Sequence, residues 1–501
     1  MNGKQLKNSI LQWAIQGKLV PQDPNDEPAR VLLDKIRQEK ERLIKEKKIK
    51  RDKNASIIYR GEDNSYYEKI LATGEVKCID EEIPFEIPLG WEWCRIVSLA
   101  DVVRGGSPRP AGSPIFYDGS IPFLKVADLT RESSIYVKSF SSTIKEAGLS
   151  KTRLVEAGTL LLTNSGATLG VPKICTFETT FNDGVAAFLS LDERLKLYVY
   201  WFFCYMTDLY RNINQGTAQP NLNTDIIKMT LVPIPPYKEQ IRIVEELGNI
   251  SPIIKHYEKA QDELDELNES IPKLIKQSIL QEAIRGKLVP QLAEEGTAQE
   301  LLEQIKEEKQ KLVKEGKLKK SALNDSVIFR GDDNKYYERI NAQTVEIELP
   351  FEYPNKWILL RLKDICQLID GEKRNGKGIC LDAKFLRGKS SATIVEKGRF
   401  VYAGDKIILV DGENSGEVFT VPQDGYMGST FKQLWLSSAM WKPYILAFIL
   451  FYKSELRNSK RGAAIPHLNK ELFYNLPIGI PPLAEQKRIT QRIDELFQLL
   501  K

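Results

Sequence analysis

The stretch KNSILQWAIQGKLVPQ at residues 7–22 returns as KQSILQEAIRGKLVPQ at residues 276–291. Thirteen of the sixteen positions are identical, and only Asn8, Trp13 and Gln16 differ from their counterparts. Chance does not produce such a match, so the chain contains an internal repeat. A repeat of this kind decides the organisation of the fold before any single motif does.

Further matches extend the repeat outward from this stretch. Four more segments recur in the same order: YRGEDNSYYEKI at 59–70 with FRGDDNKYYERI at 329–340, IPFEIP at 83–88 with LPFEYP at 349–354, AQPNLN at 218–223 with AIPHLN at 464–469, and IPPYKEQIRI at 234–243 with IPPLAEQKRI at 480–489. Between the second and third pairs the similarity fades. Conserved and variable blocks therefore alternate along the chain.

The sequence predicts five parts from this alternation. They are an N-terminal conserved helical region with its linker, a first variable domain, a central conserved helical spacer with its linker, a second variable domain and a C-terminal conserved helix, at 1–92, 93–233, 234–358, 359–479 and 480–501. The two outer pieces complete one another into a second copy of the central block. We therefore expect a circular organisation with a pseudo-two-fold axis and termini that meet.

Composition sets broad limits. The 501 residues allow about three globular units at roughly 150 residues each. The net charge of +4 is only weak evidence for a nucleic-acid partner. The six cysteines form no Cys-x-x-Cys pair and no close Cys/His cluster, so we expect neither a zinc site nor a disulfide framework. No apolar run of about 18 residues occurs, and we expect a cytoplasmic protein.

A coiled-coil pattern indicates that the conserved blocks are helical. Apolar residues in 250–274 recur at alternating spacings of three and four. Ser251-Pro252 is predicted to start this helix and Pro272 to kink or restart it. Helices at Lys4 to Gln16 and at Ala484 to Leu500 are the expected antiparallel partners. The predicted seam consists of Ile250, Ile253, Tyr257, Leu264, Leu267, Ile271 and Leu274.

The length of this seam is that of one turn of DNA. At about 1.5 Å per residue its 25 residues extend about 37 Å, and one turn of B-DNA is about 34–36 Å. A second helix pair is expected at 28–48 and 298–319, rich in Lys and Glu. These helices present either a solvated face or a docking surface for a partner subunit.

Both variable blocks are predicted to be mixed α/β, which makes the whole chain α+β. Apolar runs at 159–163 and 406–410 indicate strands, and glycine-rich turns follow each of them. Aromatic, apolar segments at 197–205 and 444–452 indicate a buried helix in equivalent places. The two blocks thus share a fold while their sequences differ.

Basic and amide side chains gather in the loops of both variable blocks. Arg forms bidentate contacts to guanine, Asn and Gln to adenine, and Lys chiefly anchors phosphate. We therefore predict a DNA-binding face in each block. The candidates are Arg104, Ser107, Arg109, Lys125, Arg131, Lys151, Arg153, Asn164, Gln219 and Asn221 in the first block. In the second block they are Lys373, Arg374, Lys377, Lys384, Arg387, Lys389, Asn414, Lys432, Arg461 and His467.

The chain resembles the specificity subunit of type I restriction-modification enzymes over nearly its whole length. No single motif is decisive, but the duplicated order of the motifs is highly specific. The motifs are GGSP at 105–108, IPFLKVADL at 121–129, LLLTNSGATLG at 160–170, GTAQPNLN at 216–223, LVDGENSG at 409–416 and GYMGSTFK at 425–432.

This resemblance implies two target-recognition domains, each reading half of a bipartite site in double-stranded DNA. It implies assembly with two modification (methyltransferase) subunits, and with two restriction (endonuclease) subunits. S-adenosylmethionine, ATP and magnesium are then expected on those partners, and no cofactor or metal in this chain. Target adenines are expected to be flipped into the partner methyltransferases.

Incomplete motifs favour a chain without a catalytic site. Pro235-Pro236-Tyr237 is similar to the Asn/Asp-Pro-Pro-Tyr motif of adenine methyltransferases, but Ile234 lacks the required carbonyl acceptor. The stretch 371–378 nearly matches a phosphate-binding loop without its hydroxyl residue, and we interpret it as a DNA-contacting or flexible loop. His256 and His467 belong to no recognisable triad. Two alternatives stay open, a self-contained DNA-modifying enzyme and a tandem adaptor without a DNA role.

Overall fold

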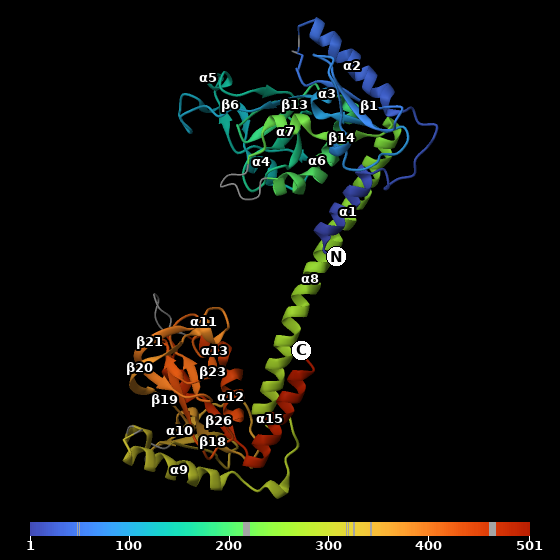
Figure 1. Ribbon diagram of the computed structural model, residues 1–501. Helices are drawn as coiled ribbons and strands as arrows, with labels where there is room; N and C mark the ends of the chain where they lie inside the picture. The colour runs from blue at the N-terminus through green and yellow to red at the C-terminus, as the bar shows by residue number, and fades with distance from the viewer. Residues whose placement is uncertain are drawn as a thin grey trace. The chain divides into compact units, whose positions relative to one another are not determined.

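The computed structural model describes residues 1–47, 49, 51–213, 221–316, 318, 320–323, 326–340, 343–459 and 467–500. They form two compact units, Met1–Leu264 and Asp265–Lys501. In Figure 1 the first unit runs from blue to green and the second from yellow to red. Each unit combines helices with sheets, so the α+β class is confirmed. Among these residues no helix is both long enough and apolar enough to cross a membrane.

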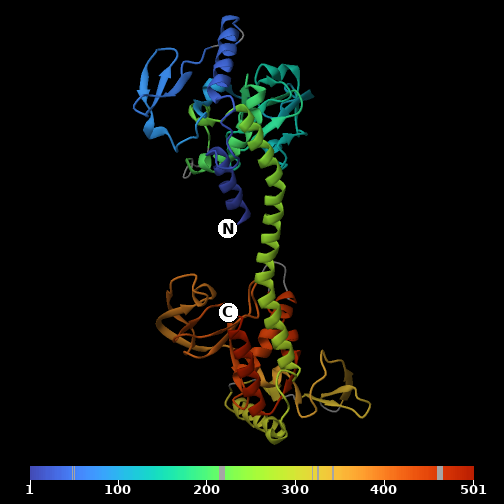
Figure 2. The ribbon, with the colours of Figure 1, turned by 90° about the vertical axis from the view of Figure 1, so that its right-hand side faces the viewer.

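The first unit opens with two amphipathic helices and a small sheet. Leu11 lies three residues before Ala14 and four before Ile15, so these side chains share one face of the first helix. This face is buried. The small antiparallel sheet, blue in Figure 2, stands out from the body of the unit. These elements are α1 (Gly3–Ile15), α2 (Ala29–Lys45), β1 (Ser56–Arg60), β2 (Tyr66–Ile70) and β3 (Val76–Cys78).

The variable part of the first unit contains two sheets, with strand orders β5-β13-β10-β11-β7 and β8-β6-β12-β9. Alternate residues of β10 face opposite sides: Leu161 joins a cluster with Phe181, whereas Leu160 packs in the cluster that holds Phe203 of α6. The elements are β5 (Asp101–Arg104), β6 (Tyr117–Leu124), α4 (Val126–Thr130), β7 (Tyr136–Val137), β8 (Thr143–Ile144), α5 (Glu146–Leu149), β9 (Leu154–Val155), β10 (Leu160–Thr163), β11 (Pro172–Cys175), β12 (Thr179–Phe181), β13 (Val185–Leu189) and α6 (Glu193–Ile213).

Two paired strands bound this variable part. β4 (Glu92–Arg95) leads into it through α3 (Ile96–Leu99), and α7 (Thr224–Met229) leads out to β14 (Leu231–Ile234). β4 and β14 are antiparallel, with Leu231 opposite Arg95 and Ile234 opposite Glu92. The first and last strands of the block are therefore hydrogen-bonded neighbours.

The second unit repeats this plan with different sheets in its variable part. A gold sheet again stands out from the body of the unit in Figure 2. Its conserved elements are α9 (Gln299–Lys314), β15 (Ser326–Arg330), β16 (Tyr336–Ile340), β17 (Gln343–Ile347), β18 (Ile358–Arg361), α10 (Leu362–Ile365), α14 (Lys470–Asn475), β26 (Pro477–Ile480) and α15 (Leu483–Gln498). Its variable elements are β19 (Cys366–Ile369), β20 (Glu372–Leu381), α11 (Ala383–Leu386), β21 (Thr393–Val401), β22 (Lys406–Leu409), β23 (Val418–Thr420), β24 (Gly425–Met427), β25 (Phe431–Leu436), α12 (Lys442–Phe451) and α13 (Lys453–Asn458).

The structure confirms the strands and helices predicted for both variable blocks. β10 and β22 cover the two predicted strands, and α6 and α12 cover the two predicted buried helices. The Lys- and Glu-rich helices are also present, as α2 and α9, although each ends several residues earlier than predicted.

The repeated sequence makes the same contacts in both units. A Cβ added to Gly17 would lie 2.5 Å from Cγ of Pro88, and one added to Gly286 would lie 2.5 Å from Cγ of Pro354. Both glycines have a positive φ, 67° and 70°, which favours glycine. The helix that precedes Gly17 is α1, and the helix that precedes Gly286 is α8 (Tyr237–Ile284). The two glycines and the helices before them therefore occupy equivalent positions in the two units.

The predicted helix start at Ser251-Pro252 is wrong. α8 (Tyr237–Ile284) is one helix of 48 residues, so it does not restart at Pro272 either. An interior proline removes one main-chain hydrogen bond and costs about 3 kcal/mol. Burial of Ile243, Leu247 and Ile254 along the first part of α8 opposes that cost, and the helix continues.

The coiled-coil seam predicted on α8 stays a prediction, because most of its side chains are exposed. Asn8 of α1 bonds to Asp208 of α6 at 2.9 Å, and Gly3 of α1 packs against α8, where a Cβ on this glycine would lie 2.6 Å from Cβ of Glu258. Thr490 of α15 accepts from Trp441 Nε1 at 2.9 Å, next to α12. Ile250 is half-buried. The exposed seam side chains, between 38 and 66 % accessible, are Ile253, Tyr257, Leu264, Leu267, Ile271 and Leu274.

A buried carboxyl group joins helix and domain in each unit. Trp91 Nε1 donates to Oε2 of Glu239 at 3.0 Å, and Trp357 Nε1 donates to Oε1 of Glu485 at 3.1 Å. Burial raises the pKa of both glutamates, and the indole hydrogen bonds act in the opposite direction. The conserved Glu of the IPP-x-x-Glu-Gln segments is thus an internal group of the fold.

We expect the Glu239→Gln variant to remove a pH-dependent destabilisation. The pKa of Glu239 is higher in the folded protein than in the unfolded chain. The protonated carboxyl group therefore stabilises the fold at pH values below the unfolded-state pKa of about 4.3, and this stabilisation is lost as the pH rises through the folded-state pKa. The stability of the variant relative to the parent should therefore increase from pH 4 to pH 7. Urea unfolding at a series of pH values measures this, and exposed Glu245→Gln on the same helix is the control. A constant difference across that range would contradict the assignment.

Candidate nucleic-acid interface

The GGSP motif forms a tightly packed loop in the first unit. Gly105 N donates to Val185 O, and Gly106 N donates to Phe181 O, each at 3.1 Å. A Cβ on Gly106 would lie 2.1 Å from the carbonyl oxygen of Lys151, a distance that excludes any side chain. The loop is therefore held against both the 151–153 segment and the turn between β12 and β13.

A polar cleft of about 400 Å³ lies beside this loop. Ser107 Oγ donates to Oδ1 of Asp183 at 2.6 Å, and this bond fixes the loop to the opposite wall. Tyr117 donates its hydroxyl to the carbonyl of Pro108 at 2.8 Å, which holds the loop from the other side. The residues that line the cleft include Ser107, Arg109, Tyr117, Asp118, Lys125, Asn182 and Asp183.

The structure brings most of the predicted basic residues of the first block to this loop. Arg109 and Lys125 line the cleft itself. Arg104 Nε donates to the carbonyl of Asp183 at 2.6 Å, and Arg153 Nε donates to the carbonyl of Arg104 at 3.1 Å. The side chains of Arg104, Arg109, Lys151 and Arg153 are exposed, so cations surround the cleft.

Two of the predicted residues in the first block do not fit this surface. Asn164 is only 1 % exposed, so it is not the loop-edge contact that the sequence predicted. It follows β10 directly, and its backbone is held by Gly184 O and Leu222 N, which turns the side chain inward. Arg131 lies at the far end of α4, where it pairs with Asp128 at 2.8 Å.

Asn221 remains exposed and forms a β-bridge with Ser165, at the NSG turn. Its counterpart in the second unit is His467, which bridges to Asp411 and has Nδ1 at 2.6 Å from Oδ1 of that residue. Gln219 and Arg461 lie outside the described residues.

The sequence did not single out Asn182 and Asp183. They form the turn between two apolar strands, TTF at 179–181 and VAAFL at 185–189, which is an ordinary strand connection by sequence. A polar pair at such a turn carries little signal by itself. Only folding places it opposite Ser107, a residue 76 positions earlier in the chain.

In the second unit the predicted basic loop is a long β-hairpin. β20 carries Lys373, Arg374 and Lys377, and it pairs with β21 across a bulge between Asn375 and Gly378. The stretch 371–378 is thus mainly a strand, and its interpretation as a loop is wrong. Residues 372–377 of β20 are all exposed, which suits a surface that contacts a ligand backbone.

Cations of the second block differ in how strongly they are held. Arg374 lies 4.3 Å above the ring of Phe400, and its Nη2 donates to the hydroxyl of Tyr402 at 3.1 Å. Arg387 pairs with Glu417, and Lys432 pairs with Asp370. Lys373, Lys377, Lys384 and Lys389 are exposed, and no such pairing is found for them within the described part of the chain. Asn414 is half-buried in the turn after β22.

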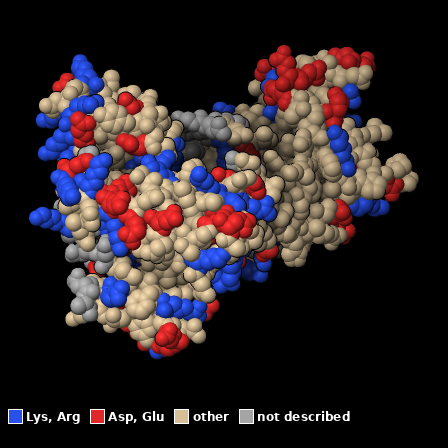
Figure 3. Space-filling model, turned by 90° about the horizontal axis from the view of Figure 1, so that it is seen from below, with Lys and Arg blue, Asp and Glu red and all other residues tan. Residues whose placement is uncertain are grey.

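Charges of both signs are mixed on the surface. Figure 3 shows one face on which Lys and Arg gather toward the left margin, while acidic side chains are scattered among them. This pattern agrees with a net charge of only +4. The basic residues of the clefts and hairpin, rather than the total charge, define the candidate interface.

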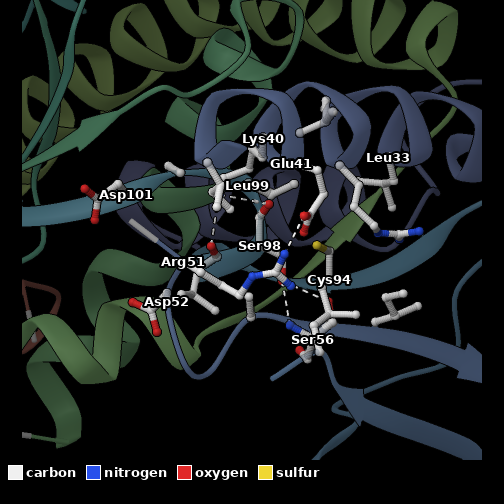
Figure 4. A pocket seen from close by; sticks show the side chains of 18 of the residues that line it. Leu33, Lys40, Glu41, Arg51, Asp52, Ser56, Cys94, Ser98, Leu99 and Asp101 are labelled. Atoms are coloured by element: carbon white, nitrogen blue, oxygen red, sulfur yellow. Dashed lines mark hydrogen bonds and ion pairs between the residues drawn. The ribbon is translucent and has the colours of Figure 1, made fainter. Parts of the chain in front are cut away.

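A second hollow in the first unit, of about 80 Å³, has a structural role (Figure 4). Lys40 Nζ donates there to the carbonyls of Val97 and Ser98, each at 3.2 Å, and burial lowers the pKa of this amine. Arg51 extends over the hollow and pairs with Glu41. No group of three or more potential metal ligands occurs among the described residues.

Comparison with known proteins gives consistent findings. The family described as type I restriction modification DNA specificity domain matches residues 88–266 and 354–501. The EcoAI specificity subunit of Escherichia coli is 25% identical over 99% of this chain and 89% of its own, and the EcoEI subunit of the same organism is 24% identical over 73% and 62%. A solved structure concerning assembly and conformational transition of the type I R-M system matches with a TM-score of 0.52, at 16% identity over 83% of this chain and 92% of that one.

We expect the Lys373→Ala/Lys377→Ala variant to bind duplex DNA more weakly, because two phosphate-anchoring charges are removed from the hairpin. The slope of log K against log salt should fall by about 0.9 for each lost contact. Anisotropy titrations with a duplex at several salt concentrations measure this. Lys335→Ala, in the turn between β15 and β16, is the control. An unchanged slope in the double variant would remove the hairpin from the interface.

Proposed function

The chain belongs to the family of type I restriction-modification DNA specificity domains, and on that premise we propose that it reads a bipartite DNA site, one half with each unit. The observation that carries this proposal is that the family matches twice, once mainly in each compact unit. The function common to the family is sequence-specific DNA recognition within a type I restriction-modification complex.

A shared frame with different side chains supports the assignment of one half-site to each unit. In the first unit Leu124 pairs in parallel with Phe181, and in the second Leu381 pairs in parallel with Met427. The residues that follow the first of these pairs line the cleft of the first unit, and the second unit has other residues at the corresponding positions. They are Lys125, Asn182 and Asp183 in the first unit, and Asp382, Gly428 and Ser429 in the second.

Different donors and acceptors at equivalent positions recognise different base edges, because each base pair has its own pattern in the major groove. In both units these positions follow a parallel pair of strands. The proposal therefore accounts for a duplicated protein that reads two unlike half-sites.

In this proposal the conserved helices set the gap between the half-sites. The circular organisation and the pseudo-two-fold, coiled-coil arrangement belong to the same hypothesis. Its support is that an IPP-x-x-Glu-Gln segment begins α8 in the first unit and α15 in the second, and that a GKLVPQ segment follows α1 in the first unit and the end of α8 in the second.

We also propose that catalysis resides on partner subunits, which would bind S-adenosylmethionine, ATP and magnesium. In this chain the IPPY segment is the junction between β14 and α8, since Ile234 ends the strand and Tyr237 begins the helix. Ile234 offers no side-chain acceptor for an adenine amino group. Cytoplasmic localisation and the presence of two modification and two restriction subunits remain predictions.

The exposed side chains of α8 are the docking surface that we propose for the modification subunits. Leu264, Leu267, Ile271 and Leu274 recur at spacings of three and four, and each is at least 44 % exposed. A continuous apolar stripe of this kind marks a protein contact more often than bare surface.

Replacing residues 93–233 by the corresponding block of a relative should change one half of the methylated sequence and leave the other half and the gap unaltered. The reason is that β4 and β14 close the block, so it can be exchanged without disturbing the helices. Methylation-aware sequencing of host DNA reports both halves at once. A change in both halves would overturn the assignment of one half-site to each unit.

The Leu267→Glu variant should bind the modification subunit about tenfold more weakly or worse, as expected for the loss of an apolar interface anchor. Its own unfolding midpoint should stay close to that of the parent, because the side chain is 52 % exposed. Quantitative co-purification measures the binding. Leu89→Glu, at a side chain 99 % exposed outside α8, is the matched control. Equal effects of the two variants would exclude α8 as the docking surface.

A further inference from the structure

Asp183 is a carboxylate in a cleft that is also lined by the cations Arg109 and Lys125 and by a second carboxylate, Asp118. Among the described residues no Lys or Arg side chain lies within ion-pair distance of its carboxylate, although the guanidinium of Arg104 binds its main-chain carbonyl. Its side chain is partly exposed, and Ser107 occupies Oδ1 from within the protein. Oδ2 has no hydrogen-bond partner among these residues and lies on the wall of the cleft.

The surroundings hold this carboxylate in one place. Ser107 belongs to the GGSP loop, which is locked by the bonds of Gly105 and Gly106 to Val185 and Phe181. The turn that carries Asp183 is fixed from the other side, since Asn182 N donates to Leu124 O at 2.9 Å. An acceptor that is already positioned loses little freedom on binding, which is what selective recognition requires.

A fixed carboxylate has a specific consequence at a DNA surface. Phosphate is repelled by it, so it does not contribute to general affinity for the backbone. Asp and Glu are favourable only opposite a hydrogen-bond donor, and in the major groove the donors are the exocyclic amino groups of adenine and cytosine. Lys125 and Arg109 in the same cleft supply the positive charge that holds the neighbouring phosphates.

Asn182 adds a second polar group beside Asp183. Its Oδ1 is buried without a hydrogen-bond partner, and its Nδ2 lies 3.4 Å from the Cβ position of Gly184. A buried acceptor without a partner is rare, so Asn182 keeps an unused hydrogen-bonding atom just beneath the surface that Asp183 lines. In the second unit Gly428 and Ser429 occupy the equivalent positions, so this pair of side chains belongs to the first unit alone.

We propose that Asp183, oriented by Ser107 and flanked by Asn182, is the specificity-determining acceptor of the first unit, and that it reads one base through an exocyclic amino group. The inference rests on the proposed DNA-reading function and names the chemistry of one contact within it. The base is an adenine or a cytosine, which share that amino donor.

The test uses the complex with its modification subunits and a duplex that carries the site found by methylation-aware sequencing. Competition binding at one fixed salt concentration compares this duplex with single-base variants of the half-site read by the first unit. Asp183→Asn should reduce discrimination at one base pair by about 5- to 150-fold, the range of one good base contact. Binding to random duplex should become tighter, since a charge that repels phosphate is lost.

Asp118→Asn is the matched control, because Asp118 lines the same cleft and loses the same charge. Its φ of 60° is tolerated by Asn. This control should change affinity for random duplex without changing discrimination at any position. If Asp183→Asn and Asp118→Asn behave alike, Asp183 contributes only charge and the inference is overturned.

Base analogues identify the amino group. At the sensitive position, purine in place of adenine or 2-pyrimidinone in place of cytosine removes only that group. The substitution should weaken binding by the parent complex and leave the Asp183→Asn complex unaffected. Full discrimination by the variant would refute the inference alone, whereas a parent complex with no sequence preference would refute the proposed function as well.

Discussion

Antiparallel pairing between the first and last strands of each variable block is the constraint on which the rest of the structure depends. β4 pairs with β14 in the first unit, and β18 pairs with β26 in the second. An arginine reinforces each pair: buried Arg95 donates from Nη1 to Met229 O, and half-buried Arg361 donates from Nη1 to Asn475 O, both at 2.7 Å. Because the ends are fixed together, the residues between them are free to differ in length and sequence at little cost in loop closure.

The same arginines tie the small protruding sheets to this closure. Arg95 bonds to Glu68 at 2.9 Å, with side chains 5 % and 0 % exposed, and Arg361 pairs with Glu338. Removing one partner of such a pair leaves a buried charge and costs about 3–5 kcal/mol. These contacts, together with the Trp–Glu bonds of the helical junctions, therefore specify how the conserved elements meet within each unit.

Where this scaffold does not require identity, the two copies have diverged. Lys309 meets the carboxylate of Asp364 at 3.3 Å, whereas the corresponding Lys40 meets only main-chain carbonyls and leaves a small hollow. The variable parts diverge further, since the first unit has sheets of five and four strands and the second has a four-stranded sheet and a small barrel of β20, β21 and β24. Conserved closure and divergent surface are what the recognition of two unlike half-sites requires.

The sequence by itself determined the repeat, the alternation of blocks, the family and the main strands and helices, because these follow from identity and from local periodicity. Residues 160–163 and 406–409 are strands for that reason. Tertiary structure alone decided which side chains are accessible and which meet. The burial of Asn164, the exposure of Leu267 and the bond from Ser107 to Asp183 all depend on segments distant in the chain. Spacing along one strand or helix carries no information about such partners, since they approach only when the chain folds.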